Sequence, residues 1–461
     1  MPELLIEKSD LRVFWSAYDP LDLASDSIDP LGFMAGYVSL ADRILPGFTT
    51  ITTIPRYASM LCLALKLARE SVGTNENITV RRRLTIDKLK LVERAWALAC
   101  GIAEEDPAIG TKATDGLRGI RAVHRWRDLN AGKEKLTVQF ELLSNQVRYG
   151  GIGAYSTFLE TLHLADMSAL TLRPLGEQLA AEFPSPAGYE LEVTRSDTKL
   201  LAESLLDWGR DSHAGMLTTP EAQILRRALQ GGEEAEFDDV TRWTMLRLIR
   251  SCDPQQQLEE SQLLATCLSS LKQNGPKNLD PISRIRTALR VIEPYEQMYQ
   301  CALFVFDRIR VRAADSGKVS LQTVLDERAV LDATAQMRKA AVGFLAETEI
   351  ASGEENSLGD AKPALQKVEV VQFAKTVSNM HAPNDIVQEV LRRHLRVQEN
   401  KFDGGLPKGP WVRLEPESMA RLTAQRFGLN ASQVKNNWQE TTRHPYRTFG
   451  AKRFIKLCKI Q

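Results

Sequence analysis

The sequence lacks the patterns from which a biochemical activity can be read directly. Its 461 residues contain no run of about 18 apolar residues, so no membrane-spanning helix is expected. Lysine plus arginine equals aspartate plus glutamate, at 59 each, which excludes a uniformly basic coat but not local charge separation. The HExxH, GxSxG and GxxxxGK[ST] patterns are absent. We therefore expect no cofactor, and no catalytic or metal-binding residue can be named.

Cysteine is scarce, and its spacing indicates no zinc site. None of the six cysteines, at positions 62, 100, 252, 267, 301 and 458, forms a CxxC pair. Most fall within apolar helical patterns, which is typical of small buried residues in a reducing compartment. The first residues, MPELLIEKSD, lack the basic and apolar regions of a secretion signal. These features favour a cytoplasmic protein.

Apolar periodicity predicts a mainly α-helical, multi-domain chain. Residues 60–70 are apolar nearly all round, 84–103 are good helix formers, and helical patterns continue from about 200 to 346. Residues 136–142 alternate apolar and polar side chains, which predicts a half-buried strand. Residues 349–363 are acidic and glycine-bearing, as linkers often are. We expect an α+β domain over 1–185 with a winged-helix-like end, a helical middle domain over 186–348, the linker, and a basic helical domain over 364–461.

Charge is distributed unevenly along the chain. Residues 391–461 hold fifteen lysines and arginines against five acids, a net charge of +10, so the preceding 390 residues carry −10. A concentration of positive charge can neutralise phosphates, but it can equally dock an acidic protein surface. The C-terminal segment is therefore the first candidate for a binding surface.

Residues 416–440 have the spacing of a helix-turn-helix. Ala424 is the small residue at the expected helix contact, Gly428 occupies the turn, and Val434 anchors the second helix. The exposed side of that helix would read bases, and the tail beyond it would contact phosphates. This hypothesis gives the DNA-binding candidates Gln433, Lys435, Asn436, Arg443, Arg447, Lys452, Arg453 and Lys456. The same spacing also occurs in ordinary helical hairpins.

A second basic region lies near the N-terminus. Residues 81–148 hold fourteen basic and nine acidic side chains, and Arg118, Arg121 and Arg125 share one face of a helix. The sequence ALTLRPLGEQLAA that follows, at 169–181, looks like the exit from wing to helix in winged-helix domains. Winged-helix folds serve protein contacts as often as DNA contacts. We add the three arginines to the DNA-binding candidates.

Several blocks of the sequence resemble uncharacterised bacterial proteins associated with antiviral and restriction gene clusters. The first block carries Leu45, Pro46, Gly47, Thr49, Arg56 and Tyr57. Two further blocks are GGIGAYSTFLETLHL, with the LTLRPLGEQLA that follows it, and HPYRTFGAKRFIKLC. The resemblance implies a defence-associated accessory component and supplies no catalytic residue.

These observations together favour a non-enzymatic DNA-binding or scaffold subunit of a bacterial anti-phage defence system, with double-stranded DNA as its partner. Two alternatives remain open. The chain could be a helical adaptor that docks a helicase or nuclease through protein contacts, or it could be a nuclease whose site no motif reveals. No membrane partner is expected.

Overall fold

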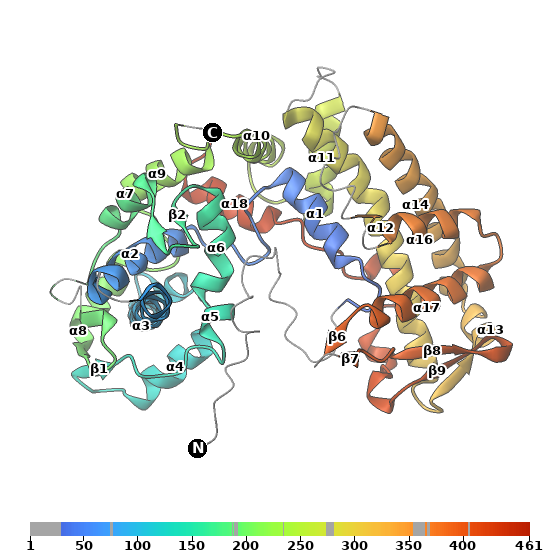
Figure 1. Ribbon diagram of the computed structural model, residues 1–461, viewed down its shortest axis with the longest axis horizontal. Helices are drawn as coiled ribbons and strands as arrows, with labels where there is room; N and C mark the ends of the chain where they lie inside the picture. Colours follow the sequence, from blue (N-terminus) through green and yellow to red (C-terminus); the bar gives the residue numbers. More distant parts are fainter. Residues whose placement is uncertain are drawn as a thin grey trace. The chain divides into compact units, whose positions relative to one another are not determined.

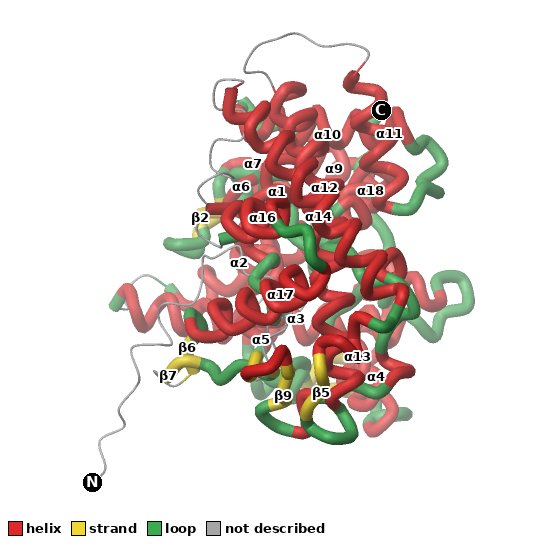
Figure 2. Tube along the Cα trace, turned by 90° about the vertical axis from the view of Figure 1, so that its right-hand side faces the viewer, coloured by secondary structure: helices red, strands yellow, loops and turns green. Residues whose placement is uncertain are grey.

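The computed structural model describes residues 29–73, 77–186, 188, 192–233, 235–272, 281–353, 365–366, 369–403 and 406–461. These residues are mainly helical, as the sequence predicts. Figure 2 shows the strands as short pieces between the helices. The chain divides into two compact units, each made from separate stretches of sequence. Of the described residues, the first unit holds those in 45–260 and 447–461, and the second those in 29–44 and 261–446.

The first unit is built around helices α2 and α3. Its helices are α2 (Pro55–Val72), α3 (Ile78–Ala103), α4 (Ile120–Leu129), α5 (Gln146–Tyr149), α6 (Gly151–Thr161), α7 (Pro174–Glu182), α8 (Ala202–Ser212), α9 (Thr219–Leu229), α10 (Phe237–Cys252) and α18 (Thr448–Leu457). Figure 1 shows α3 nearly end-on, with α2, α4, α5 and α8 around it. Helix α8 approaches α3 closely because Gly209 has no side chain, and a Cβ there would lie 2.1 Å from the Ala99 carbonyl oxygen.

The apolar patterns of 60–70 and 84–103 are confirmed as the buried cores of α2 and α3. Tyr57 packs edge-on against Trp96 and stacks on Tyr155, with ring centroids 5.0 and 5.2 Å apart. Arg56, fully buried, forms an ion pair with Glu221 and donates to the carbonyl oxygens of Asp211 and Ser212. A buried charge of this kind is tolerated because it is paired and fully hydrogen-bonded.

Two small antiparallel sheets complete the first unit. β1 (Lys135–Thr137) pairs with β4 (Lys199–Leu201), and β2 (Ala165–Asp166) pairs with β3 (Thr171–Leu172). The strand predicted over 136–142 is shorter than expected because its partner β4 has three residues, although burial alternates through Leu142. The β2–β3 hairpin leads into α7 as the sequence suggests, but it forms a sheet of its own and does not extend β1.

The second unit packs around the long helix α12. It contains α1 (Met34–Ile44), most of α11 (Glu260–Lys272), α12 (Pro281–Ala313), α13 (Leu321–Leu325), α14 (Arg328–Gly353), α16 (Val370–Asn379) and α17 (Pro383–Glu399). Helix α12 packs along α14 and continues through Pro294, a residue type that usually interrupts or kinks a helix. Ser320 caps α13, as expected of a helix start, and α14 begins separately at Arg328.

A three-stranded antiparallel sheet lies in the second unit. Its order is β5 (Lys318–Ser320), β9 (Met419–Leu422) and β8 (Val412–Glu415), and β6 (Phe402–Asp403) pairs separately with β7 (Leu406–Pro407). Strands β5 and β9 are about a hundred residues apart in sequence, so no local pattern could reveal their pairing.

The helix-turn-helix predicted over 416–440 is wrong. This segment contains strand β9 and the 3₁₀ turns Pro416–Ser418, Gln425–Phe427, Ala431–Gln433 and Trp438–Glu440. Ala420 and Leu422 are buried on alternate positions of β9, which satisfies the apolar pattern with a strand period. Gly428 has extended backbone angles (φ −66°, ψ 155°) and not the left-handed turn expected of it.

The predicted domain boundaries do not coincide with the two units. The boundary after residue 185 falls inside the first unit, and residues 364–461 are divided between both units at Tyr446 and Arg447. The acidic linker expected over 349–363 is in part helix, because α14 continues to Gly353. Its remainder lies outside the described residues.

Candidate nucleic-acid interface

The three polar candidates on the expected recognition helix lie on irregular backbone in the second unit. Gln433, Lys435 and Asn436 are exposed. The side-chain oxygen of Gln433 accepts a hydrogen bond from the Asn430 N–H at 2.8 Å, as part of a reciprocal cap. These side chains are not presented by a helix, so the base contacts expected of them have no helical support.

The cations of the C-terminal tail are largely engaged within the protein. Arg443 forms an ion pair with Glu293, with the closest atoms 2.7 Å apart. Arg447 is buried, and Lys452 contacts the Asp253 carboxylate at 2.6 Å. Of the five tail cations proposed to bind DNA, Lys456 alone is exposed. The tail is therefore not the open cationic strip that its sequence indicated.

Lys452 fastens α18 to the segment after α10. Its ammonium group donates to the Leu258 carbonyl oxygen at 2.7 Å as well as contacting Asp253. Burial alone would raise the pKa of the Asp253 carboxyl. Hydrogen bonds from Lys452 and from the N–H groups of Gln257 and Leu258 lower this pKa by more than burial raises it, so the net shift is downward. Asp253 is thus held ionised as a structural counter-charge for Lys452.

Helix α4 is seated on α3 by three of its residues. Val123 fits against Gly101, where a Cβ would lie 2.3 Å from the valine Cγ1. His124 contacts Glu104 at 2.5 Å, and Arg127 donates to the Gly101 carbonyl oxygen at 2.9 Å. These contacts fix which side of α4 faces outward.

The outward side of α4 carries two of the predicted arginines. Arg121 and Arg125 are both exposed and lie one helical turn apart, about 6 Å along the axis. Arg118 precedes the helix and is half-buried, and its guanidinium group donates to the Tyr149 carbonyl oxygen. Arg118 therefore positions the start of α4, while Arg121 and Arg125 are available to a ligand.

The structure brings the two basic regions of the sequence together within the first unit. Arg453 of α18 contacts the Asp115 carboxylate at 3.1 Å, three residues before Arg118. Gly116 has φ +77°, and a Cβ there would lie 3.2 Å from the Arg453 guanidinium nitrogen, so the two segments are in direct contact. Sequence spacing alone could not show that residues 115–118 and 453 are neighbours.

Sequence reasoning missed one exposed aromatic residue on α18. Phe449 is 66% exposed, near the basic side chains of the same helix. An aromatic residue beside lysine or arginine in a basic segment is the signal that could have identified it, because such pairs are used for stacking on nucleic-acid bases.

The described residues offer little for other chemistries. They hold no group of three or more His, Cys, Asp or Glu side chains that could bind a metal ion. Burial raises the pKa of the Cys100 and Cys458 thiols to about 12, so neither is a nucleophile near neutral pH.

In the described part of the chain, no helix has the length and apolar character needed to cross a membrane.

Comparison with known proteins gives no relative. Neither family models, curated proteins nor solved structures gave a match to this chain.

Proposed function

We propose that the chain is a non-enzymatic subunit that binds the phosphate backbone of double-stranded DNA through the outer face of α4 in the first unit. The observation that carries the proposal is the pair Arg121 and Arg125, exposed one turn apart on a helix whose remaining arginine, Arg127, donates to a carbonyl oxygen of α3. Guanidinium groups suit phosphate oxygens because they donate in a planar fork.

The neighbouring α18 supports the same surface. Lys456 is exposed on this helix, and the Arg453–Asp115 contact holds α18 next to the segment that begins α4. Phosphate contacts carry no sequence information by themselves. The proposed binding is therefore independent of sequence, and we no longer assign base contacts to Gln433, Lys435 and Asn436.

Fluorescence anisotropy with a labelled duplex, measured on the full chain across a salt series, tests this proposal. The unaltered chain should bind less tightly as salt rises, since counterions are released from DNA. The Arg121→Ala/Arg125→Ala variant should bind at least about tenfold less tightly at low salt. Each lost phosphate contact lowers the slope of log affinity against log salt by about 0.9, so the pair should lower it by roughly 1.8.

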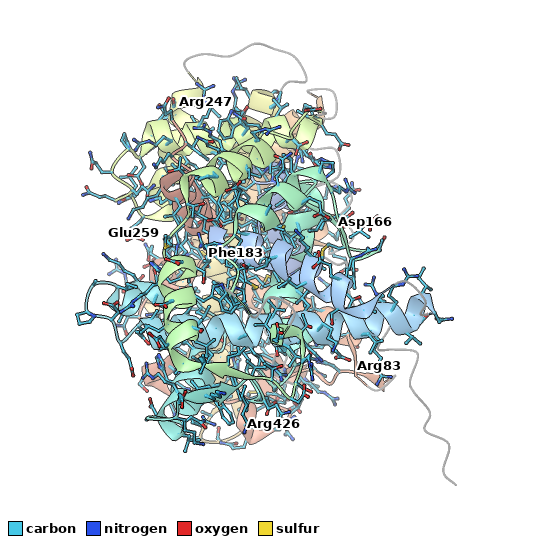
Figure 3. The ribbon with its side chains drawn as sticks, turned by 90° about the vertical axis from the view of Figure 1, so that its left-hand side faces the viewer. Arg83, Asp166, Phe183, Arg247, Glu259 and Arg426 are labelled. Carbon is cyan, nitrogen blue, oxygen red and sulfur yellow. The ribbon has the colours of Figure 1, made fainter. Side chains whose placement is uncertain are left out.

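The matched control is Arg227→Ala/Arg247→Ala, which removes two exposed arginines from α9 and α10 of the same unit. Arg247 is labelled in Figure 3, on α10. This control should keep nearly all of the affinity. Equal losses in both variants would show that only net charge matters, and a chain that does not bind duplex at all would refute the proposal.

The wider role rests on the sequence resemblance alone. We propose that the protein serves as an accessory or scaffold component of a bacterial anti-phage defence system. The alternative of an adaptor that docks a helicase or nuclease is favoured by one observation, a groove in the second unit that is lined by Arg392, Lys408 and Arg413. An interaction test made after nuclease treatment of the lysate would separate the two functions, since only protein docking survives loss of DNA.

A further inference from the structure

An open groove of about 450 Å³ lies within the second unit, between α17 and the segment that includes β8. Leu391 and Leu395 of α17 form one side, and Pro410 and Leu414 form the other. Leu395 is 36% exposed. Figure 1 shows α17 alongside β8, and the two elements pack together. The groove therefore has an apolar floor that remains partly open to solvent.

Strand β8 is an edge of its sheet, and its free edge can be identified from hydrogen bonds. The Thr423 N–H donates to the Trp411 carbonyl oxygen, and the Leu422 N–H donates to Gly317, beside β5. The backbone N–H and C=O groups of odd-numbered residues therefore join β8 to β9. Those of even-numbered residues in β8 point to the opposite edge of the strand. The N–H and C=O groups of Val412 and Leu414 are consequently directed away from β9.

Val412 is fully buried, so Leu414, which is partly exposed, is the residue that offers a template for another strand. Within the described residues, no hydrogen bond from a neighbouring element ends on the backbone of Leu414. An unpaired edge of this kind accepts an extended peptide through main-chain hydrogen bonds. The apolar groove beside it supplies the pocket that such a peptide needs for its side chains.

The charges around the groove favour an acidic occupant. Arg392, Lys408 and Arg413 line it, against the single acid Glu399. Arg413 lies directly across the ladder from Arg421, a pairing of like charges that is unfavourable. Glu415 contacts Arg421 at 2.9 Å, but no carboxylate of the described residues forms an ion pair with Arg413. An anion from outside the protein would supply the missing counter-charge.

We propose that the groove binds an extended acidic segment of a partner protein, which adds as a strand to the free edge of β8. Alternate side chains of the segment point in opposite directions. Apolar ones pack on Leu391, Leu395 and Leu414, and acidic ones face Lys408 and Arg413. This inference is independent of DNA binding, because it concerns the second unit and Arg121 and Arg125 belong to the first.

The probe is a fluorescein-labelled peptide of alternating glutamate and valine, added to the full chain. We expect saturable binding, and slower hydrogen exchange at the Leu414 amide in the complex. A peptide of alternating lysine and valine should not bind. The glutamate peptide with its backbone nitrogens methylated should bind at least about tenfold less tightly, since it cannot complete the ladder.

Two variants of the chain separate the edge from the charge. Leu414→Pro removes an outward N–H and leaves the β8–β9 hydrogen bonds intact. An edge strand tolerates proline at such a position. Its matched control, Leu414→Val, keeps the N–H. Lys408→Glu/Arg413→Glu reverses two charges in the groove, and Lys375→Glu/Lys435→Glu reverses two exposed charges elsewhere in the second unit. Leu414→Pro and the groove charge reversal should each lower peptide affinity at least about tenfold, and the controls less than about twofold.

Several results would overturn the proposal. One is the absence of glutamate-peptide binding, and another is binding without slower exchange at the Leu414 amide. If duplex DNA displaces the peptide, and the Lys408→Glu/Arg413→Glu variant no longer binds that DNA, the groove is a nucleic-acid site. A dimer of the free chain that Leu414→Pro dissociates would identify a second copy as the occupant. The Arg121→Ala/Arg125→Ala variant should keep full peptide binding, so failure of the DNA proposal leaves this one intact.

Discussion

His394 is a buried residue whose protonation state is set by its two hydrogen-bond partners. Nδ1 lies 2.8 Å from the Pro30 carbonyl oxygen, and Nε2 accepts the Trp411 N–H at 2.8 Å. The ring therefore carries its proton on Nδ1 and is neutral, since a protonated Nε2 could not accept. Burial lowers the pKa of His394 to about 4. This side chain connects α17, the start of α1 and the entry to β8 within the second unit.

The lowered pKa of His394 predicts that acid weakens the second unit. An unfolded histidine has a pKa near 6.5, so below about pH 6.5 the unfolded chain takes up a proton that the folded chain refuses. The stabilisation is complete above that pH and is lost as pH falls toward about 4. Between about pH 7 and about pH 5 the free energy of unfolding should fall by roughly 2 kcal/mol through this group.

The His394→Gln variant provides the comparison. It removes the titrating group, so it should be less stable near pH 7 and should lose less stability on acidification than the unaltered chain does. The urea concentration at the midpoint of unfolding, measured for both proteins at both pH values with hydrogen exchange in α17 as the probe, reports both effects. An identical loss in the two proteins would show that His394 does not control the acid response.

At the scale of elements, the sequence predicted what depends on local apolar period. Helices α2 and α3 were found because apolar residues and good helix formers gather within one continuous stretch for each helix. The segment 416–440 misled because Ala424, Gly428 and Val434 have the spacing of a helix-turn-helix although they lie on extended backbone. The deciding contact, β9 against β5, comes from residues 318–320. The sequence named Arg121 and Arg125 as DNA-binding candidates, and both are exposed. Only the contacts of α4 with α3 show that Arg127, on the same helix, is held inward.

The seat of α4 on α3 yields an element-scale prediction. In Gly101→Ala the new Cβ would lie 2.3 Å from Val123 Cγ1, much closer than van der Waals contact. Overpacking of this kind costs about 1–3 kcal/mol, which outweighs the gain of up to about 1 kcal/mol from replacing a helical glycine by alanine. Helix α4 should move from its seat, so its amides should exchange faster and duplex binding should weaken.

The double variant Gly101→Ala/Val123→Ala is the matched rescue. It removes the clashing Cγ1, and the next contact of the new Cβ lies at 3.7 Å, on Val123 Cβ. Slow exchange in α4 and duplex binding should both return toward those of Val123→Ala alone. If Gly101→Ala changes neither measurement, then the position of α4 does not depend on this contact.

At the scale of the whole molecule, the chain passes between its two units several times. Of the described residues, 29–44 belong to the second unit and 45–260 to the first, and after 261–446 in the second unit the last fifteen residues return to the first. Composition and linker patterns identify boundaries only between contiguous domains, so they could not predict this arrangement. The same return explains why the basic tail is not free, since Phe454 of α18 packs against Phe48 and Phe158 at centroid distances of 5.1 and 5.0 Å.

The fragment 364–461, which the sequence indicates as a basic domain, should therefore not fold by itself. It would lack β5, the partner of β9, and α12, against which α17 packs. Its α18 would lack Phe48 and Phe158. Circular dichroism should show no cooperative thermal transition for the fragment, whereas the full chain should unfold cooperatively.

Deleting only residues 447–461 from the full chain tests the same division in the other direction. The deletion removes α18 from contact with α2 and α10, so amides of those two helices should exchange faster. Amides of α12 and α14 should be unchanged, because both helices belong wholly to the second unit. Faster exchange in α12 and α14 as well, or a sharp melting transition for fragment 364–461, would contradict the division at Tyr446 and Arg447. Loss of duplex binding in the deletion variant would then reflect the removal of Lys456 together with the packing of α18, and only the Arg121→Ala/Arg125→Ala variant isolates the charge of α4.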